Sequence, residues 1–171
     1  ISTPSRLPGG DRRALLATVE RYDAAWSRFR PDSLIGHAAR TPGRIELPAE
    51  AAALGELYGT LYRLTDGAMT PLIGRSLARL GYDASYTLRP GGAPLPAPRW
   101  EEVLDWRGTA LTTTAPVLID VGAAGKGQLA DLLSAQLRDG GCAEHFIDAS
   151  GDLLNPGPEP VAVALEHPYD P

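Results

Sequence analysis

The residues between Val117 and Asp131 carry the strongest chemical signal in the sequence. An apolar run leads into a turn of small residues, Gly122-Ala123-Ala124-Gly125, which Lys126 follows directly. Such a turn lets backbone N–H groups approach a ligand, and the helix expected after it adds partial positive charge at its N-terminus. Lys126 is the chain's only lysine, and it places a full positive charge there. The combination predicts a site for a phosphate or diphosphate.

Two well-known nucleotide motifs are excluded at this turn. A P-loop requires Ser or Thr after its Gly-Lys pair, whereas Gly127 stands there. The dinucleotide fingerprint G-x-G-x-x-G is also absent, because the glycines occur in the order G-x-x-G-x-G and the usual acidic residue at the ribose position is missing. The residues alone leave a plain alternative open, in which a tight strand–helix turn carries one solvated lysine.

Several carboxylates lie in or near this region. Asp120 ends the apolar run, where a side chain can reach a site at the edge of a sheet. Asp131 lies five residues after Lys126 and therefore on a different face of the helix, which suits a surface charge. Asp148 and Asp152 bracket a short turn and could bind a metal, although Asp-Gly turns are common without that role. The histidines, His37, His145 and His167, are not at metal-ligand spacing.

Apolar periodicity predicts helices over residues 11–29, 48–65, 71–80 and 126–139 to position these side chains. In the second helix the expected apolar stripe is Leu54, Leu57, Leu61 and Leu64, and Asp66-Gly67 ends it. Short runs of strand-forming residues predict strands over 85–89, 110–114, 116–121, 144–149 and 160–165. Residues 90–98, rich in Pro and Gly, predict a loop.

Composition narrows the class of protein. The chain has 171 residues, of which 43% are hydrophobic and 22% charged, a composition typical of a globular domain. A net charge of −5 argues against a nucleic-acid binder. No apolar run approaches the roughly 20 residues of a membrane span. Cys142 is the only cysteine, which excludes an internal disulfide and a thiolate metal cage.

These elements predict an α+β fold, in which helices pack on a largely antiparallel sheet with one strand–helix–strand unit around Lys126. We expect a single domain over residues 1–171. The chain begins at Ile1 rather than Met and ends at Pro171, so we also expect it to be incomplete at both ends. Its location, cytoplasmic or extracytoplasmic, is left open, and membrane anchoring is expected only if a leader is missing.

Four segments follow a known pattern in the right order. The first is Ser27-Arg28-Phe29-Arg30-Pro31-Asp32-Ser33, similar to S-x-F/Y-x-x-x-S, and the second is Thr65-Asp66-Gly67-Ala68-Met69-Thr70-Pro71, similar to T-D-G-A-F-D-P. The third runs from Asp120 to Asp131, similar to D-L-G-A-x-A-K-G-x-x-x-D. The fourth is Asp148-Ala149-Ser150-Gly151-Asp152-Leu153, similar to N-x-G-G-D-I, and Leu165-Glu166-His167-Pro168 is similar to the strand end that follows it. Together they resemble the FAD:protein FMN transferases, the ApbE family.

The resemblance implies a role for particular residues. It implies that Asp120 and Lys126 contact FAD and that the backbone carbonyl of Ala123 binds Mg²⁺. It also implies that Phe29 takes the aromatic position of the first segment. The flavin-contact positions of the second segment fall on Ala68, Met69 and Thr70.

The activity implied is transfer of FMN from FAD to a Thr or Ser hydroxyl of a client flavoprotein, with Mg²⁺ bridging the diphosphate and AMP leaving. Two alternatives share the site: a non-catalytic FAD-binding protein, and an FAD diphosphatase that releases FMN and AMP. A third alternative is an α+β domain without a ligand.

The sequence also departs from the family pattern. Met69-Thr70 replaces Phe-Asp, and Ser150 replaces the second glycine of the fourth segment. The family's C-terminal half, which carries a carboxylate and a hydroxyl that complete the Mg²⁺ site, has no counterpart here. One backbone carbonyl cannot hold Mg²⁺, so we expect the isolated chain to be inactive.

Overall fold

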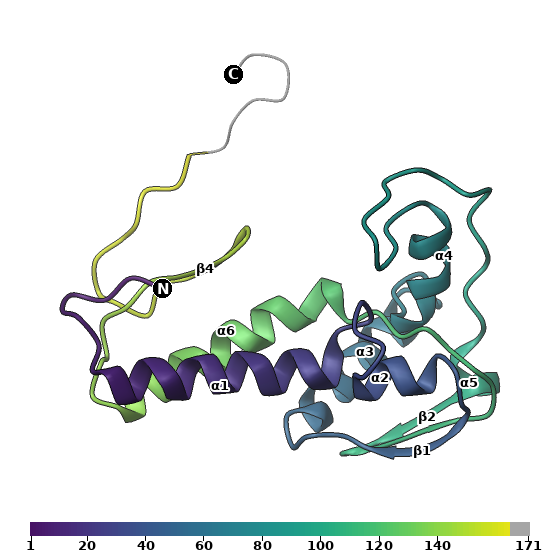
Figure 1. The fold of residues 1–171 in the computed structure, drawn as a ribbon, viewed down its shortest axis with the longest axis horizontal. Helices are drawn as coiled ribbons and strands as arrows, with labels where there is room; N and C mark the ends of the chain where they lie inside the picture. The colour runs from purple at the N-terminus through teal and green to yellow at the C-terminus, as the bar shows by residue number, and fades with distance from the viewer. Residues whose placement is uncertain (165–171) are drawn as a thin grey trace. The chain divides into compact units, whose positions relative to one another are not determined.

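The computed structural model describes residues 1–164 and divides into two compact units (Figure 1). Unit 1 consists of Ile1–Leu16 and Lys126–Pro171, and unit 2 consists of Ala17–Gly125. Two helices, α1 (Gly9–Trp26) and α6 (Gly122–Asp139), each contribute residues to both units. No helix among the described residues is long and apolar enough to cross a membrane.

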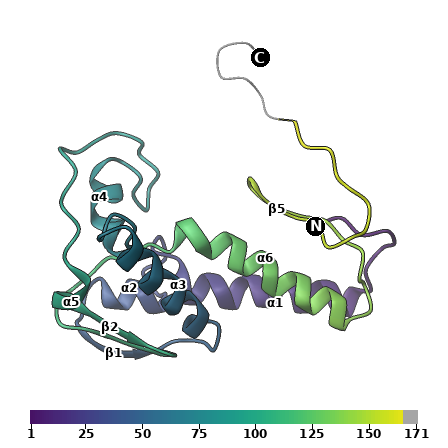
Figure 2. The same ribbon diagram turned by 180° about the vertical axis from the view of Figure 1, so that it is seen from behind.

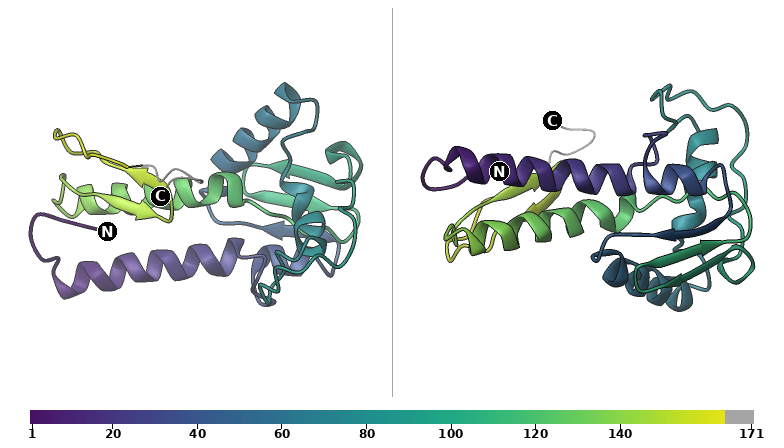
Figure 3. Two further views of the ribbon diagram at one scale, coloured as in Figure 1. Left: turned by 90° about the horizontal axis from the view of Figure 1, so that it is seen from above. Right: turned by 60° about the horizontal axis from the view of Figure 1, so that its bottom comes forward.

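Unit 2 is built around a three-stranded antiparallel sheet in the order β1-β3-β2. Leu111 on the central strand pairs with Ile45 on one side and Trp106 on the other, and it is fully buried. Helix α3 packs against β2 (Figure 3). The elements of unit 2 after α1 are α2 (Leu34–Ala38), β1 (Gly43–Glu46), α3 (Ala51–Leu64), the 3₁₀ helix η1 (Pro71–Ile73), α4 (Gly74–Arg79), α5 (Trp100–Val103), β2 (Leu104–Arg107) and β3 (Ala110–Thr113).

Helix α3 buries a different face from the predicted one. Its buried residues are Ala51, Leu54, Gly55 and Tyr58, whereas Leu57 and Leu64 are 44% and 78% exposed. The reason is close packing at Gly55, where a Cβ atom would lie 2.7 Å from Nε1 of Trp106. The helix therefore turns its small-residue face towards this indole. Of the predicted stripe, only Leu54 is buried.

Unit 1 joins the first half of α1 to α6 and a hairpin (Figure 2). Its core contains Leu15 from α1, three residues of α6 and one strand residue, namely Ala130, Leu133, Leu137 and Ile147. Strands β4 (Ile147–Ala149) and β5 (Asp152–Leu154) pair antiparallel. The two residues between them, Ser150 and Gly151, have φ angles of 59° and 103°, as a tight hairpin turn requires.

The fold class is confirmed: helices pack with antiparallel sheets. The helices predicted over 11–29, 48–65, 71–80 and 126–139 are present, as are the loop over 90–98 and the strand over 110–114. The run over 144–149 forms a strand only in its last residues. Elements α2, β1, β2 and β5 were not predicted.

Three predicted strands were wrong in the described residues. The runs 85–89 and 116–121 are not strands, nor is 160–164; Leu165 and the block from Leu165 to Pro168 lie outside the described residues. The backbone bonds of the run before α6 go to the ends of helices: Val117 N–H donates to the carbonyl of Ala38, the last residue of α2, and Asp120 N–H donates to that of Pro71, the first residue of η1. The strand–helix–strand unit therefore lacks its first strand.

A glycine contact between α4 and the run before α6 gives a stability test. A Cβ atom on Gly74 would lie 2.4 Å from the backbone oxygen of Leu118, so Gly74→Ala must displace backbone. We expect a loss of about 1–3 kcal/mol in the free energy of unfolding, measured with urea. Gly127→Ala in α6 is the control, because a Cβ there meets nothing within 4 Å. That variant should be neutral or stabilised by up to about 1 kcal/mol. Equal destabilisation of both would contradict the packing described here.

Candidate functional site

A buried ion pair joins the first and third segments in unit 2. Arg28 Nε donates to Oδ2 of Asp120 over 2.5 Å, and the two side chains are 4% and 12% exposed. Arg28 Nη2 also donates to the backbone oxygen of Tyr82 over 2.7 Å. The guanidinium carbon lies 4.2 Å from the ring centre of Phe29 and 4.7 Å from that of Tyr82. Two hydrogen bonds and two aromatic rings thus hold the guanidinium of Arg28 in place.

An aromatic cluster surrounds this guanidinium. Phe29 stacks on Tyr86 with ring centres 4.9 Å apart, and it meets Tyr82 edge-on at 5.4 Å. Phe29 is half-buried, whereas Tyr82 and Tyr86 are 41% and 54% exposed. The predicted flavin-contact aromatic therefore lies in a partly open group of three rings. Sequence reasoning did not identify either tyrosine as part of a site.

The loop that carries both tyrosines was predicted as a strand. Tyr86 and Leu88 have φ angles of 48° and 50°, which a strand does not allow. Asp83 organises the loop: its carboxylate accepts from the amides of Ser85 and Thr87 and from the Thr87 hydroxyl. The bond from the Thr87 hydroxyl is the main reason that the pKa of Asp83 lies below its ordinary value. Local side-chain bonds have replaced strand pairing here.

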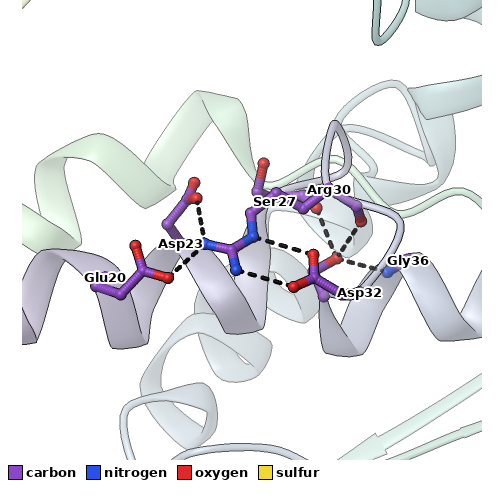
Figure 4. Close-up of polar contacts among 7 residues, drawn as sticks. Glu20, Asp23, Ser27, Arg30, Asp32 and Gly36 are labelled. Carbon is purple, nitrogen blue, oxygen red and sulfur yellow. Dashed lines mark hydrogen bonds and ion pairs between the residues drawn. The ribbon is translucent and has the colours of Figure 1, made fainter.

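Arg30, two residues after Arg28, has a structural role (Figure 4). It bonds to three carboxylates, those of Glu20, Asp23 and Asp32. These bonds raise the pKa of Arg30, and the bond with Arg30 lowers the pKa of Asp32. Because all these groups are partly or fully exposed, the network contributes little to stability. Its effect is to hold the turn after α1 in one geometry.

Ser33 closes the same turn through bonds to Ser27 and Gly36. Its hydroxyl donates to the backbone oxygen of Ser27 over 2.6 Å and accepts from Gly36 N–H over 2.9 Å, so it caps α2. The side chain is buried. The two serines of the first segment therefore shape the backbone that presents Arg28 and Phe29.

The second segment reaches the same place through its backbone. Asp120 N–H donates to the oxygen of Pro71 over 2.8 Å. Thr70 is buried and its hydroxyl accepts from Leu72 N–H over 3.2 Å, which caps η1. Ala68 is exposed and Met69 is half-buried. Parts of the first, second and third segments thus meet around Asp120, and Thr70 serves as a helix cap where the family pattern has a carboxylate.

The first turn of α6 differs from the open cradle that the sequence predicts. Gly122 N–H donates to Oδ1 of Asp120 over 2.7 Å, and the amides of Ala124 and Gly125 donate to the oxygen of Val121. The buried Tyr58 hydroxyl lies beside the amides of Ala123 and Ala124. The protein itself therefore occupies three of the donors expected to bind phosphate, the amides of Gly122, Ala124 and Gly125.

Lys126 lies in unit 1 beside the fourth segment. Its ammonium nitrogen is 3.3 Å from the backbone oxygen of Ser150 and 3.3 Å from Oδ2 of Asp152, and both charged side chains are about half exposed. Asp148 accepts from Gly151 N–H and so stabilises the hairpin turn. Lys126 thus remains accessible for an anion.

A sequence model of the ApbE family matches residues 5–171. The chain belongs to the ApbE family. Among curated proteins, none matches the chain.

Solved structures of ApbE proteins share this fold. A mutant of the flavin transferase ApbE from Vibrio cholerae has a TM-score of 0.74 at 19% identity, covering 98% of this chain and 62% of its own. The flavinyl transferase ApbE from Pseudomonas stutzeri, in its apo form, has a TM-score of 0.68 at 18% identity, with coverage of 91% and 52%. The ApbE protein from Thermotoga maritima has a TM-score of 0.69 at 24% identity, with coverage of 92% and 54%. The chain thus spans between about half and three fifths of their lengths.

The described part of this ApbE-family chain does not by itself fit Mg²⁺. Between residues 1 and 164, no group of three or more His, Cys, Asp or Glu side chains could hold a metal ion. Ala123 is exposed and offers one backbone carbonyl. Asp120 is already bonded to Arg28 and Gly122. Magnesium prefers about six oxygen ligands, so these residues leave most of its coordination shell unfilled.

Other sequence candidates are peripheral to this site. His145 is buried, with Nε2 2.8 Å from the hydroxyl of Ser134 and Nδ1 3.0 Å from the backbone oxygen of Cys142, as in a core histidine. His37 and Asp131 are exposed, and His167 lies outside the described residues. A cavity of about 560 Å³ in unit 2 lies elsewhere: its lining includes Gly55, Tyr62, Trp100 and Trp106 and none of the predicted site residues.

Removing the Ser33 cap tests the first segment. Ser33→Ala leaves Gly36 N–H buried without its acceptor, so we expect a loss of about 1–2 kcal/mol in the free energy of unfolding. Ser85→Ala is the matched control, because Ser85 is exposed and bonds to Asp83 through its backbone amide, which the substitution keeps. Urea unfolding monitored by tryptophan fluorescence measures both. Unchanged stability of Ser33→Ala would contradict the capping role.

Tyr58 gives a test at alkaline pH. Burial is the main cause that raises its pKa to about 12 from 10.0, and the negative charge of Asp120 adds to the rise. The folded protein therefore keeps this proton where the unfolded chain loses it, so its stabilising effect is complete below pH 10 and declines as the pH rises towards 12. We expect Tyr58→Phe to lessen this alkaline loss by about 2 kcal/mol, measured as unfolding free energy against pH. Parallel curves for the two proteins would refute it.

Proposed function

We propose that this chain serves the transfer of FMN from FAD to a Thr or Ser hydroxyl of a client flavoprotein. The observation that carries the proposal is the meeting of three segments around Asp120, through its side-chain bond to Arg28 and its backbone bond to Pro71. Membership of the ApbE family and the fold shared with flavin transferases support it.

The proposed site residues serve two parts of FAD, the flavin ring and the diphosphate. Phe29 offers an aromatic face for the flavin ring within the cluster of three rings. Ala68, Met69 and Thr70 would contact the flavin from the second segment. Lys126 would offset the charge of the diphosphate, and Asp120 would take part through the groups that it holds.

The reaction is a phosphoryl transfer. The oxygen of the client hydroxyl forms a bond to the FMN-side phosphorus, the bond from that phosphorus to the AMP oxygen breaks, and the hydroxyl proton passes to a base. The protein's own contribution is to position FAD and to stabilise charge on the phosphate oxygens. Because the described residues do not form a magnesium site, no step is assigned to a metal.

The first test is calorimetric titration of FAD into the protein, with and without Mg²⁺. We expect Lys126→Ala to weaken FAD binding by about tenfold, because it removes one half-exposed cation from the diphosphate. Arg138→Ala is the matched control, since Arg138 is an exposed cation in the last turn of the same helix. Equal affinity of Lys126→Ala and the unmodified protein would contradict the role of Lys126.

The reaction itself is tested by incubating the full-length protein with FAD, Mg²⁺ and a client flavoprotein. Release of AMP together with covalently bound flavin on the client supports transfer. Free FMN and AMP with an unlabelled client would replace the proposal by FAD hydrolysis. Bound but intact FAD would replace it by non-catalytic binding.

A further inference from the structure

The guanidinium of Arg28 has one edge without a partner. Its Nε and Nη2 each make one bond, to Asp120 and to the Tyr82 backbone, whereas Nη1 donates to no group among the described residues. Nη1 is also absent from the fully buried unpartnered side-chain atoms of residues 1–164. A side chain that is 96% buried thus keeps a pair of N–H donors without a partner among the described residues.

The aromatic cluster lies against the same guanidinium. The guanidinium carbon lies over the rings of Phe29 and Tyr82, at 4.2 and 4.7 Å from the ring centres. The donors of Nη1 are therefore next to the residue proposed to contact the flavin ring. An arginine in this arrangement suits an anionic oxygen attached to an aromatic ligand.

Four other donor groups of the first and third segments in unit 2 are already bonded within the protein. The amides of Gly122, Ala124 and Gly125 bond within the protein. Arg30 is bonded to three carboxylates. Unlike those groups, Arg28 lies against Phe29 and keeps Nη1 without a partner among the described residues.

We propose that Arg28 binds a phosphate oxygen of the flavin dinucleotide through Nη1, and that Asp120 is a positioning residue that holds the guanidinium through Nε. The inference rests on the proposed function, because it takes a flavin nucleotide as the ligand. It assigns a residue whose type is left unspecified in the S-x-F/Y pattern. It also gives Asp120 an indirect role in place of a direct contact with FAD.

This arrangement distinguishes phosphorylated from unphosphorylated flavins. Riboflavin has the same ring as FAD and lacks the phosphates, so it can use Phe29 but not Nη1 of Arg28. Asp120 offsets the charge of Arg28, and Asp83 also lies close enough for its pKa to respond to Arg28. Discrimination therefore depends on directed hydrogen bonds more than on net charge.

The test is to titrate FAD and riboflavin separately into the unmodified protein and Arg28→Gln, following flavin fluorescence. We expect FAD binding to weaken by about 10–100-fold and riboflavin binding to change by less than about twofold. Arg44→Gln is the control, because Arg44 is exposed and pairs only with Glu46 at 3.6 Å among the described residues. It should leave both affinities unchanged.

Two further variants separate binding from folding. Arg28→Lys keeps the positive charge and the pairing with Asp120 but lacks the planar guanidinium. It should therefore also weaken FAD binding more than riboflavin binding, relative to the unmodified protein. If thermal unfolding shows that Arg28→Gln is not folded, Arg28→Lys replaces it as the test variant. Asp120→Asn keeps an acceptor for Gly122 and loosens Arg28, so it should weaken FAD binding by a smaller factor and spare riboflavin.

The outcomes distinguish this inference from the proposed function. If the unmodified protein binds FAD and the folded Arg28 variants bind it equally well, the inference is wrong and the proposed function stands. Equal weakening of FAD and riboflavin would show that Arg28 only supports the fold. If the unmodified protein binds no FAD, the proposed function fails and the inference fails with it.

Discussion

The ion pair between Arg28 and Asp120 is the constraint on which unit 2 depends. It joins residues 92 positions apart, and both side chains are largely removed from water. Removing one partner of such a pair leaves the other charge buried, typically at a cost of about 3–5 kcal/mol. Asp120 also accepts from Gly122 N–H and donates its own N–H to Pro71. One residue thus links the turn after α1, the start of η1 and the start of α6.

Short-range polar contacts around this pair make its geometry specific. The cap by Ser33 and the carboxylates around Arg30 fix the backbone before and after Phe29. On the other side, Asp83 holds the loop that supplies the Tyr82 backbone oxygen to Arg28. These bonds add little stability singly, because most are exposed. Together they restrict the guanidinium of Arg28 to few positions. Recognition by hydrogen bonds requires such a fixed donor, because less conformational freedom is then lost on binding.

The sequence predicted the helices well because their signal is local. Spacing of three and four residues and glycine stop signals are sufficient for α1, α3 and α6. The prediction of a strand over 116–121 was wrong because Val117, Ile119 and Val121 are buried in alternation, as in a strand, but pair with no strand among the described residues. The site could be predicted only in part: resemblance indicated Phe29 and Asp120, but the bond from Arg28 to Asp120 is long-range and has no signal in spacing. Neither Tyr82 nor Tyr86 lies in a segment that carried the resemblance.

The charged groups of the site in unit 2 bear on whether it favours a metal cation or a phosphate. Thr70 occupies the position where the family pattern has a carboxylate, and its hydroxyl caps η1 instead of facing a ligand. Arg28 adds a cation whose charge is offset by the nearby Asp120. The described site in unit 2 is therefore poorer in free carboxylate oxygen than the family pattern implies, and it has a free pair of N–H donors. Carboxylate oxygens suit metal cations, whereas fixed N–H donors suit phosphate oxygens. The local chemistry of unit 2 thus favours the anionic part of a flavin nucleotide over a metal ion.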